Sequence, residues 1–127
     1  MRLLLDTSFL IDVLRGRNRR KEQLKDLLNA GHTLSTTALN VAEIYVGMRL
    51  HEQRETEVLL GQLECHELTG RAARMGGAFV SQWGQRGRTL QLPDALVAAI
   101  SIENQCVLVT DNRKDFPMPE VQLYPLS

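Results

Sequence analysis

Two short, continuous apolar runs stand out in the hydrophobic pattern of the chain, Leu3–Leu5 and Cys106–Val109. Runs of this length without polar alternation are typical of strands buried on both faces, as in parallel sheets. Asp6 follows the first run directly, and the segment 110–115, which contains two further acids, follows the second. We therefore predict two central strands whose carboxyl ends carry carboxylates at the same edge of one sheet.

The rest of the pattern predicts helices between short strands. Apolar residues at helical spacing, together with capping residues and terminal glycines, predict six helices. They run from residue 8 to about 15, from 17–21 to 31, from 36 or 37 to about 50, from 52 to 62, from 70 to about 85, and from 93 to about 103. Weaker strands are expected at 32–36 and 121–124, and residues 63–69 are expected to form a short strand or a loop. This alternation predicts an α/β sandwich with a mostly parallel central sheet.

Composition indicates a single globular domain but does not indicate what the protein binds. A chain of 127 residues, 43% hydrophobic and 24% charged, is expected to form one domain over residues 1–127. Fifteen basic and fifteen acidic residues give no net charge, so any attraction to nucleic acid must come from local patches. We see no membrane-spanning run, no signal peptide and no disulfide framework, so we expect a cytoplasmic protein.

Two further acids are candidates to join Asp6 at the sheet edge. Glu43 lies in an apolar helical segment, with Asn40 on the same face one turn earlier. Asp94 follows Pro93 in the first turn of the last helix. Each also has an ordinary explanation, because Glu43 can face solvent and an acid at a helix start is favoured by the macrodipole.

If these acids meet the 110–115 loop, the site holds four or five carboxylates. Like charges so close need compensation, and a shell of oxygen ligands without His or Cys selects Mg²⁺ or Mn²⁺. Such ions activate water and stabilise charge on a phosphoryl group. Nearby basic residues could hold phosphates, although each taken alone is explained more simply as a surface charge: Arg86, Arg88, Arg113 and Lys114.

Four segments, in this order, resemble PIN-domain ribonucleases and most closely the VapC toxins of toxin–antitoxin pairs. They are LLLDTSFLIDVL, TTALNVAEIYVGM, LPDALVAAIS and VLVTDNRKDF, and the resemblance extends in this order over nearly the whole chain. The resemblance implies a three-layer α/β/α sandwich that cleaves RNA with Mg²⁺ or Mn²⁺. It also implies inhibition by a small antitoxin protein and, usually, a homodimer.

The resemblance assigns the first three acids to Asp6, Glu43 and Asp94. Many members have an aspartate two residues after the threonine that corresponds to Thr110, whereas this chain has Asn112 there. The fourth acid is therefore Asp115 or Asp111, and we place Asp115 in the site. Residues expected to orient the acids from outside the metal shell are Thr7, Ser8, Asn40, Thr110, Asp111 and Asn112.

We therefore predict a metal-dependent endoribonuclease of the VapC toxin type. Asp6 and Asp94 would bind the ion directly, Glu43 would complete the shell or position water, and Asp115 would close the site. One alternative is a metal-dependent phosphatase with Asp6 as nucleophile, although Ser8 stands where such enzymes usually need an acid. Another is a non-catalytic module that binds RNA or protein, which Asn112 favours.

Overall fold

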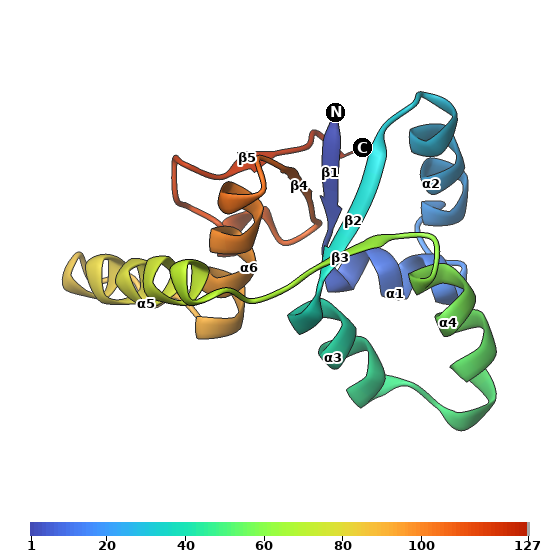
Figure 1. Cartoon of the computed structure of the whole chain (residues 1–127), viewed down its shortest axis with the longest axis horizontal. Helices are drawn as coiled ribbons and strands as arrows, with labels where there is room; N and C mark the ends of the chain where they lie inside the picture. The colour runs from blue at the N-terminus through green and yellow to red at the C-terminus, as the bar shows by residue number, and fades with distance from the viewer. Residues whose placement is uncertain (127) are drawn as a thin grey trace.

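The computed structural model describes residues 1–126, which form five strands and six α-helices (Figure 1). The strands are β1 (Arg2–Leu5), β2 (Thr33–Thr37), β3 (Glu64–His66), β4 (Val107–Val109) and β5 (Gln122–Leu123). The helices are α1 (Thr7–Arg15), α2 (Arg20–Asn29), α3 (Ala38–Gly47), α4 (Gln53–Leu60), α5 (Gly70–Gln85) and α6 (Leu92–Glu103). Two single 3₁₀ turns are η1 (Leu50–Glu52) and η2 (Arg113–Asp115).

The strands form one sheet in the order β3-β2-β1-β4-β5, and every pairing among the described residues is parallel. Leu4 of β1 lies opposite Ser35 of β2 and Leu108 of β4, so the first strand of the chain is the middle strand of the sheet. The two strands predicted to be central are neighbours in the sheet interior. Their carboxyl ends therefore lie side by side, as the apolar runs predicted.

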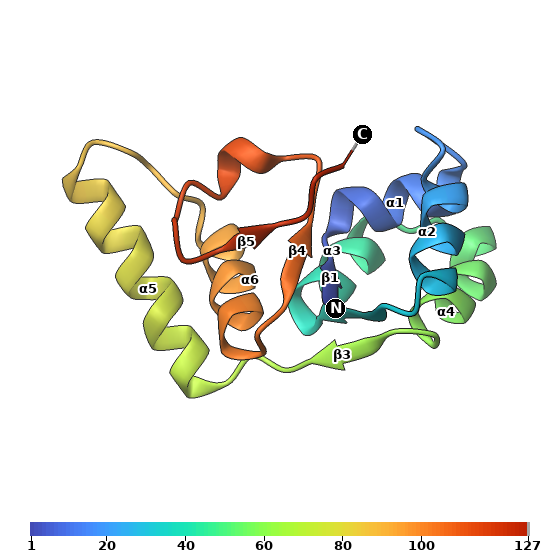
Figure 2. The same ribbon diagram turned by 90° about the horizontal axis from the view of Figure 1, so that it is seen from above.

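Alternate residues of the central strands point into two separate hydrophobic layers. Leu4 and Leu108 pack against α5 and α6, whereas Leu3, Leu5 and Val109 pack against helices α1 to α4. Figure 2 shows α5 and α6 on one side of the sheet and α1, α2 and α4 on the other. The fold is the α/β sandwich that the alternation of elements predicted, with helices on both faces of a parallel sheet.

Capping residues explain the end of α1 and the beginning of α3. Gly16 ends α1 in the left-handed conformation, at φ 65°, and Thr37 begins α3 by accepting a hydrogen bond from the backbone N–H of Asn40. The helix expected to run to about Leu50 instead ends at Gly47, and a 3₁₀ turn follows. The apolar residues near its end are exposed, with Val46 at 88% and Leu50 at 87%, so core packing does not extend the helix that far.

Helices α5 and α6 approach each other closely at Gly76. A Cβ added there would lie 3.2 Å from Cα of Leu96 and 2.7 Å from Cδ2 of the same residue. The neighbouring Gly77 faces open space. Of the two glycines, only Gly76 is therefore needed for the close contact between α5 and α6. No helix within residues 1–126 is long and apolar enough to cross a membrane.

Candidate active site

Asp6 lies at the centre of the carboxyl edge of the sheet. It follows β1, its backbone N–H donates to the carbonyl of Val109 at 3.0 Å, and it is 7% exposed. Although it occupies the N-cap position of α1, its side chain makes no capping hydrogen bond. The carboxylate instead accepts from Asn40 Nδ2 at 3.0 Å and from Thr110 Oγ1 at 2.8 Å. Two neighbouring elements thus hold it from opposite sides.

Asn40 is fully buried and forms hydrogen bonds with several residues around Asp6. The Thr37 hydroxyl donates to its Oδ1 at 2.7 Å, which fixes the side-chain amide with its nitrogen toward Asp6. The same nitrogen donates to Thr7 Oγ1 at 2.9 Å, and the Thr7 hydroxyl donates to Glu43 Oε1 at 2.8 Å. A continuous hydrogen-bond chain therefore links Asp6 to Glu43, whose side chain is otherwise exposed.

Asp94 faces the same edge from the first turn of α6 and is half-buried. Burial and, in decreasing order, the charges of Asp115, Asp6 and Glu43 together raise the pKa of Asp94 to about 6. Burial also raises the pKa of Asp6, although hydrogen bonds from Thr110, Thr7 and Asn40 oppose that rise. The structure therefore brings together the four acids that the sequence singled out, close enough for their charges to interact.

This donor set fits a divalent cation that prefers oxygen ligands. Burial and neighbouring carboxylates raise the pKa values of Asp6 and Asp94, and a cation would favour the charged forms of both. In the described part of the chain, no three Asp, Glu, His or Cys side chains are already grouped as a ready-made ligand shell. Asp6, Glu43, Asp94 and Asp115 are the residues that could draw together around an ion.

The loop after β4 distributes its polar residues differently. Thr110 is buried and also accepts from the backbone N–H of Asn112 at 3.0 Å, whereas the Asn112 side chain is exposed. Asp111 forms an ion pair with Arg20 of α2, and its side chain stays 33% exposed. Asp115 lies in η2 and is half-buried, and the next residue, Phe116, is 3% exposed and anchors the turn in the core.

The four basic residues proposed as phosphate contacts have diverse surroundings. Arg88 donates to the backbone carbonyl of Lys114, and Arg113 donates to the carbonyl of Tyr124 at 3.0 Å. The Arg86 guanidinium lies 5.1 Å from the centre of the Trp83 ring. Lys114 has an exposed side chain. Arg88 and Arg113 thus brace the segment after β4, while Arg86 and Lys114 lie on the surface.

Two residues near the site differ from what the sequence indicated. Ser8 Oγ is buried and makes no hydrogen bond within residues 1–126. The sequence singles out no role for Arg20, yet it is 6% exposed and contacts the loop after β4. No local signal separates Arg20 from its basic neighbours, because its partner is 91 residues away in the chain.

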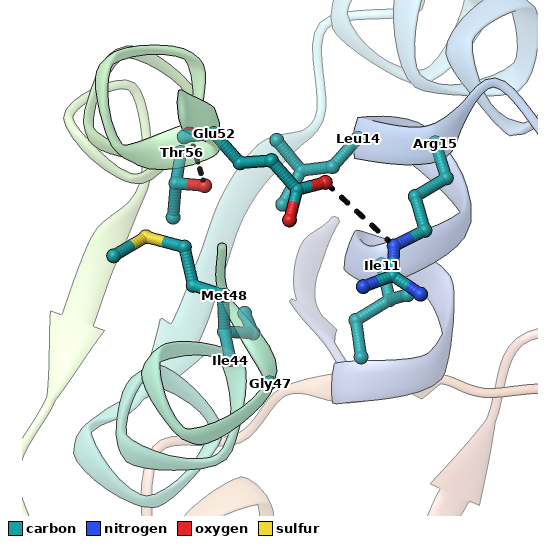
Figure 3. Close-up of a pocket in the computed structure, with 8 residues that line it drawn as sticks. All are labelled: Ile11, Leu14, Arg15, Ile44, Gly47, Met48, Glu52 and Thr56. Atoms are coloured by element: carbon teal, nitrogen blue, oxygen red, sulfur yellow. Dashed lines mark hydrogen bonds and ion pairs between the residues drawn. The ribbon is translucent and has the colours of Figure 1, made fainter. Parts of the chain in front are cut away.

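A small pocket lies apart from the acids, among α1, α3 and the segment that begins α4 (Figure 3). Its volume is about 30 Å³, and apolar side chains including Ile11, Leu14 and Ile44 form much of its wall. Arg15 Nε and Glu52 Oε2 approach to 3.9 Å across it. The pocket is too small for a nucleotide and none of the four acids lines it, so it is not a candidate active site.

Comparison with known proteins places these observations in a family. The model described as "PIN domain" matches residues 3–119. The ribonuclease VapC19 of Mycobacterium tuberculosis is 30% identical over 94% of this chain and 96% of its own length. A solved VapBC2 complex from Rickettsia felis, bound to a promoter DNA fragment, has a TM-score of 0.87 at 21% identity and covers both chains fully. A toxin–antitoxin complex from Klebsiella pneumoniae has a TM-score of 0.79 at 26% identity, over 98% of this chain and 99% of that one.

Proposed function

This chain belongs to the PIN-domain family, and we propose that it is a Mg²⁺- or Mn²⁺-dependent endoribonuclease, the toxin of a toxin–antitoxin pair. The observation that carries the proposal is the meeting of Asp6, Glu43, Asp94 and Asp115 at one sheet edge. Support for the substrate comes from the similar protein named as a ribonuclease, VapC19. Support for an antitoxin partner comes from the toxin–antitoxin complexes among the similar structures.

In this proposal each acid has a distinct task. Asp6 is held in place by Asn40 and Thr110, so it can bind a cation without losing side-chain entropy on binding. Asp94 is the second direct ligand, since burial and the charges of three other acids raise its pKa to about 6 and a cation would favour its charged form. A divalent cation supplies Lewis acidity toward a phosphodiester oxygen and makes water a better nucleophile at neutral pH.

The remaining residues act on the attacking water, complete the site or contact the RNA. Glu43 is exposed and oriented by the Thr7 hydroxyl, so it can accept a proton from the attacking water or complete the ligand shell. Asp115 closes the site from the loop after β4. Arg86 and Lys114, which are exposed on segments leading to and from the site, are candidates to contact the RNA backbone.

The test is cleavage of total RNA by the purified protein with Mg²⁺, with Mn²⁺ and with a chelator. We expect endonucleolytic products with either ion, none with the chelator, and none from Asp6→Asn. RNA binding without cleavage under all conditions would instead support the non-catalytic module. Release of inorganic phosphate from a small phosphomonoester, with intact RNA, would support the phosphatase.

The proposed partners need a separate measurement. Co-expression with the short reading frame next to this gene, followed by affinity capture and size-exclusion chromatography, should yield a complex that no longer cleaves RNA. The same column should show the free protein as a homodimer. If the protein cleaves RNA but no partner inhibits it, the proposed ribonuclease activity stands and the proposed role as a toxin does not.

A further inference from the structure

Arg20, the first residue of α2, reaches from the helix layer to the loop after β4. Its side chain is 7% exposed, and its guanidinium donates to the carboxylate of Asp111 and to the side chain of Gln23. The same group lies 5.7 Å from the centre of the Phe9 ring on α1. One cation thus connects α1, α2 and the loop that carries Asp115.

Stability alone is a weak reason for such a contact. Burying the Arg20 guanidinium removes it from water, whereas the Asp111 side chain stays 33% exposed, so this ion pair offsets only part of the desolvation cost of the guanidinium. The turn that brings Arg20 inward also contains two non-glycine residues with left-handed backbone, Asn18 at φ 55° and Arg19 at φ 57°. Strained backbone of this kind persists where the surrounding structure requires it and is frequent at functional sites.

The position of Asp111 indicates what the contact does. It follows Thr110, whose hydroxyl donates to Asp6, and it lies shortly before η2, where Asp115 sits. The side chains of 111–114 are exposed, so packing does little to hold this stretch between its two buried ends, Thr110 and Phe116. Arg88 donates to the backbone carbonyl of Lys114 in this stretch, and Arg20 donates to the side-chain carboxylate of Asp111.

We propose that Arg20 is a positioning residue that, through Asp111, sets the backbone of the 110–116 loop and so places Asp115 opposite Asp6 and Asp94. The consequence for catalysis rests on the proposed ribonuclease function, whereas the consequence for the loop does not. Because Arg20 is buried, it does not contact RNA. Its loss should therefore lower the rate of the chemical step and the affinity for Mg²⁺ while leaving the KM for RNA nearly unchanged.

The experiment compares Arg20→Met, Asp111→Asn and the double variant with wild type. Arg19→Met is the matched control, because Arg19 precedes Arg20 in the chain but is exposed and pairs with Glu22 at 2.8 Å. Amide hydrogen exchange of the 110–116 segment is measured in chelator, Mg²⁺ affinity by calorimetry, and RNA cleavage under single-turnover conditions.

For Arg20→Met we expect faster exchange in 110–116, with Mg²⁺ affinity and cleavage rate each reduced by about tenfold to a hundredfold. The double variant should be no worse than Arg20→Met, because both changes break the same pair, and Arg20→Lys should restore part of each loss. Arg19→Met should match wild type in exchange and in Mg²⁺ affinity. If Arg20→Met does not fold, Asp111→Asn is compared with wild type in the same three measurements, because this change breaks the same ion pair and keeps the size of the side chain.

Unchanged exchange of 110–116 in folded Arg20→Met, or in Asp111→Asn if the former does not fold, would overturn the proposal. A loss confined to KM, shared by Arg19→Met, would also overturn it, because that result indicates a phosphate contact. Failure of the proposed function looks different. The wild type would then leave RNA intact with Mg²⁺, while faster exchange in the Arg20 variant would still show that this arginine positions the loop.

Discussion

The charge of Asp94 should cost the metal-free protein stability at neutral pH, and Asp94→Asn should recover it. Burial, with Asp115, Asp6 and Glu43 nearby, raises the pKa of Asp94 from 3.8 to about 6 in the folded state. Between these two pH values the folded protein binds a proton at Asp94 that the unfolded chain has released. The free energy of unfolding therefore falls as pH rises from about 4 to about 6, and the penalty is complete above pH about 6.

The size of the stability penalty follows from the pKa shift of Asp94 and from the exposure of its side chain. A shift of this size corresponds to about 3 kcal/mol if converted in full. Because the side chain is only half-buried, solvent screening reduces the expected penalty to about 1 kcal/mol. For a chain of this length, that difference raises the melting temperature of Asp94→Asn by about 4 °C at pH 7 in chelator. At pH 4 or below, wild type and variant should melt together.

The assay is thermal unfolding of both proteins across this pH range in chelator, repeated with Mg²⁺. Only wild type should gain stability from Mg²⁺, because the variant has lost a direct ligand, and the variant should not cleave RNA. Asp26→Asn, on the exposed surface of α2, controls for the loss of any single negative charge. A variant that is less stable than wild type at pH 7 in chelator, or that cleaves RNA at the wild-type rate, would refute this reasoning.

Two further predictions test the loop after β4 and the contact between α5 and α6. Asp115→Asn should slow single-turnover cleavage at saturating Mg²⁺ by about tenfold to a hundredfold without lowering the melting temperature, and a full rate would mean that three acids suffice. Gly76→Ala should destabilise the fold by about 1 kcal/mol or more, because its methyl group meets Leu96, whereas Gly77→Ala should stabilise it by up to about 1 kcal/mol through helix propensity. Chemical denaturation measures both changes, and equal signs would contradict the packing argument.

The sequence by itself determined most of the strands and helices and the position of Asp6 in the candidate site. The apolar runs Leu3–Leu5 and Cys106–Val109 predicted interior parallel strands, and the helix at 70–85 was predicted to its ends. These features are readable because strand burial, helix periodicity and capping depend on residues a few positions apart. Asp6 was placed at the sheet edge by the same local logic, since it follows a buried strand directly.

Only the tertiary structure decided which distant side chains meet. The sequence placed Asn40 on the face of Glu43, but its complete burial and its bonds to Asp6 and Thr7 depend on α3 lying beside the end of β1. Likewise, the pairing of Asp111 with Arg20 requires the order β2-β1-β4 and the packing of α2 on the face shared with α1. Such contacts join segments tens of residues apart, and local periodicity carries no information about them because strand order sets the neighbours.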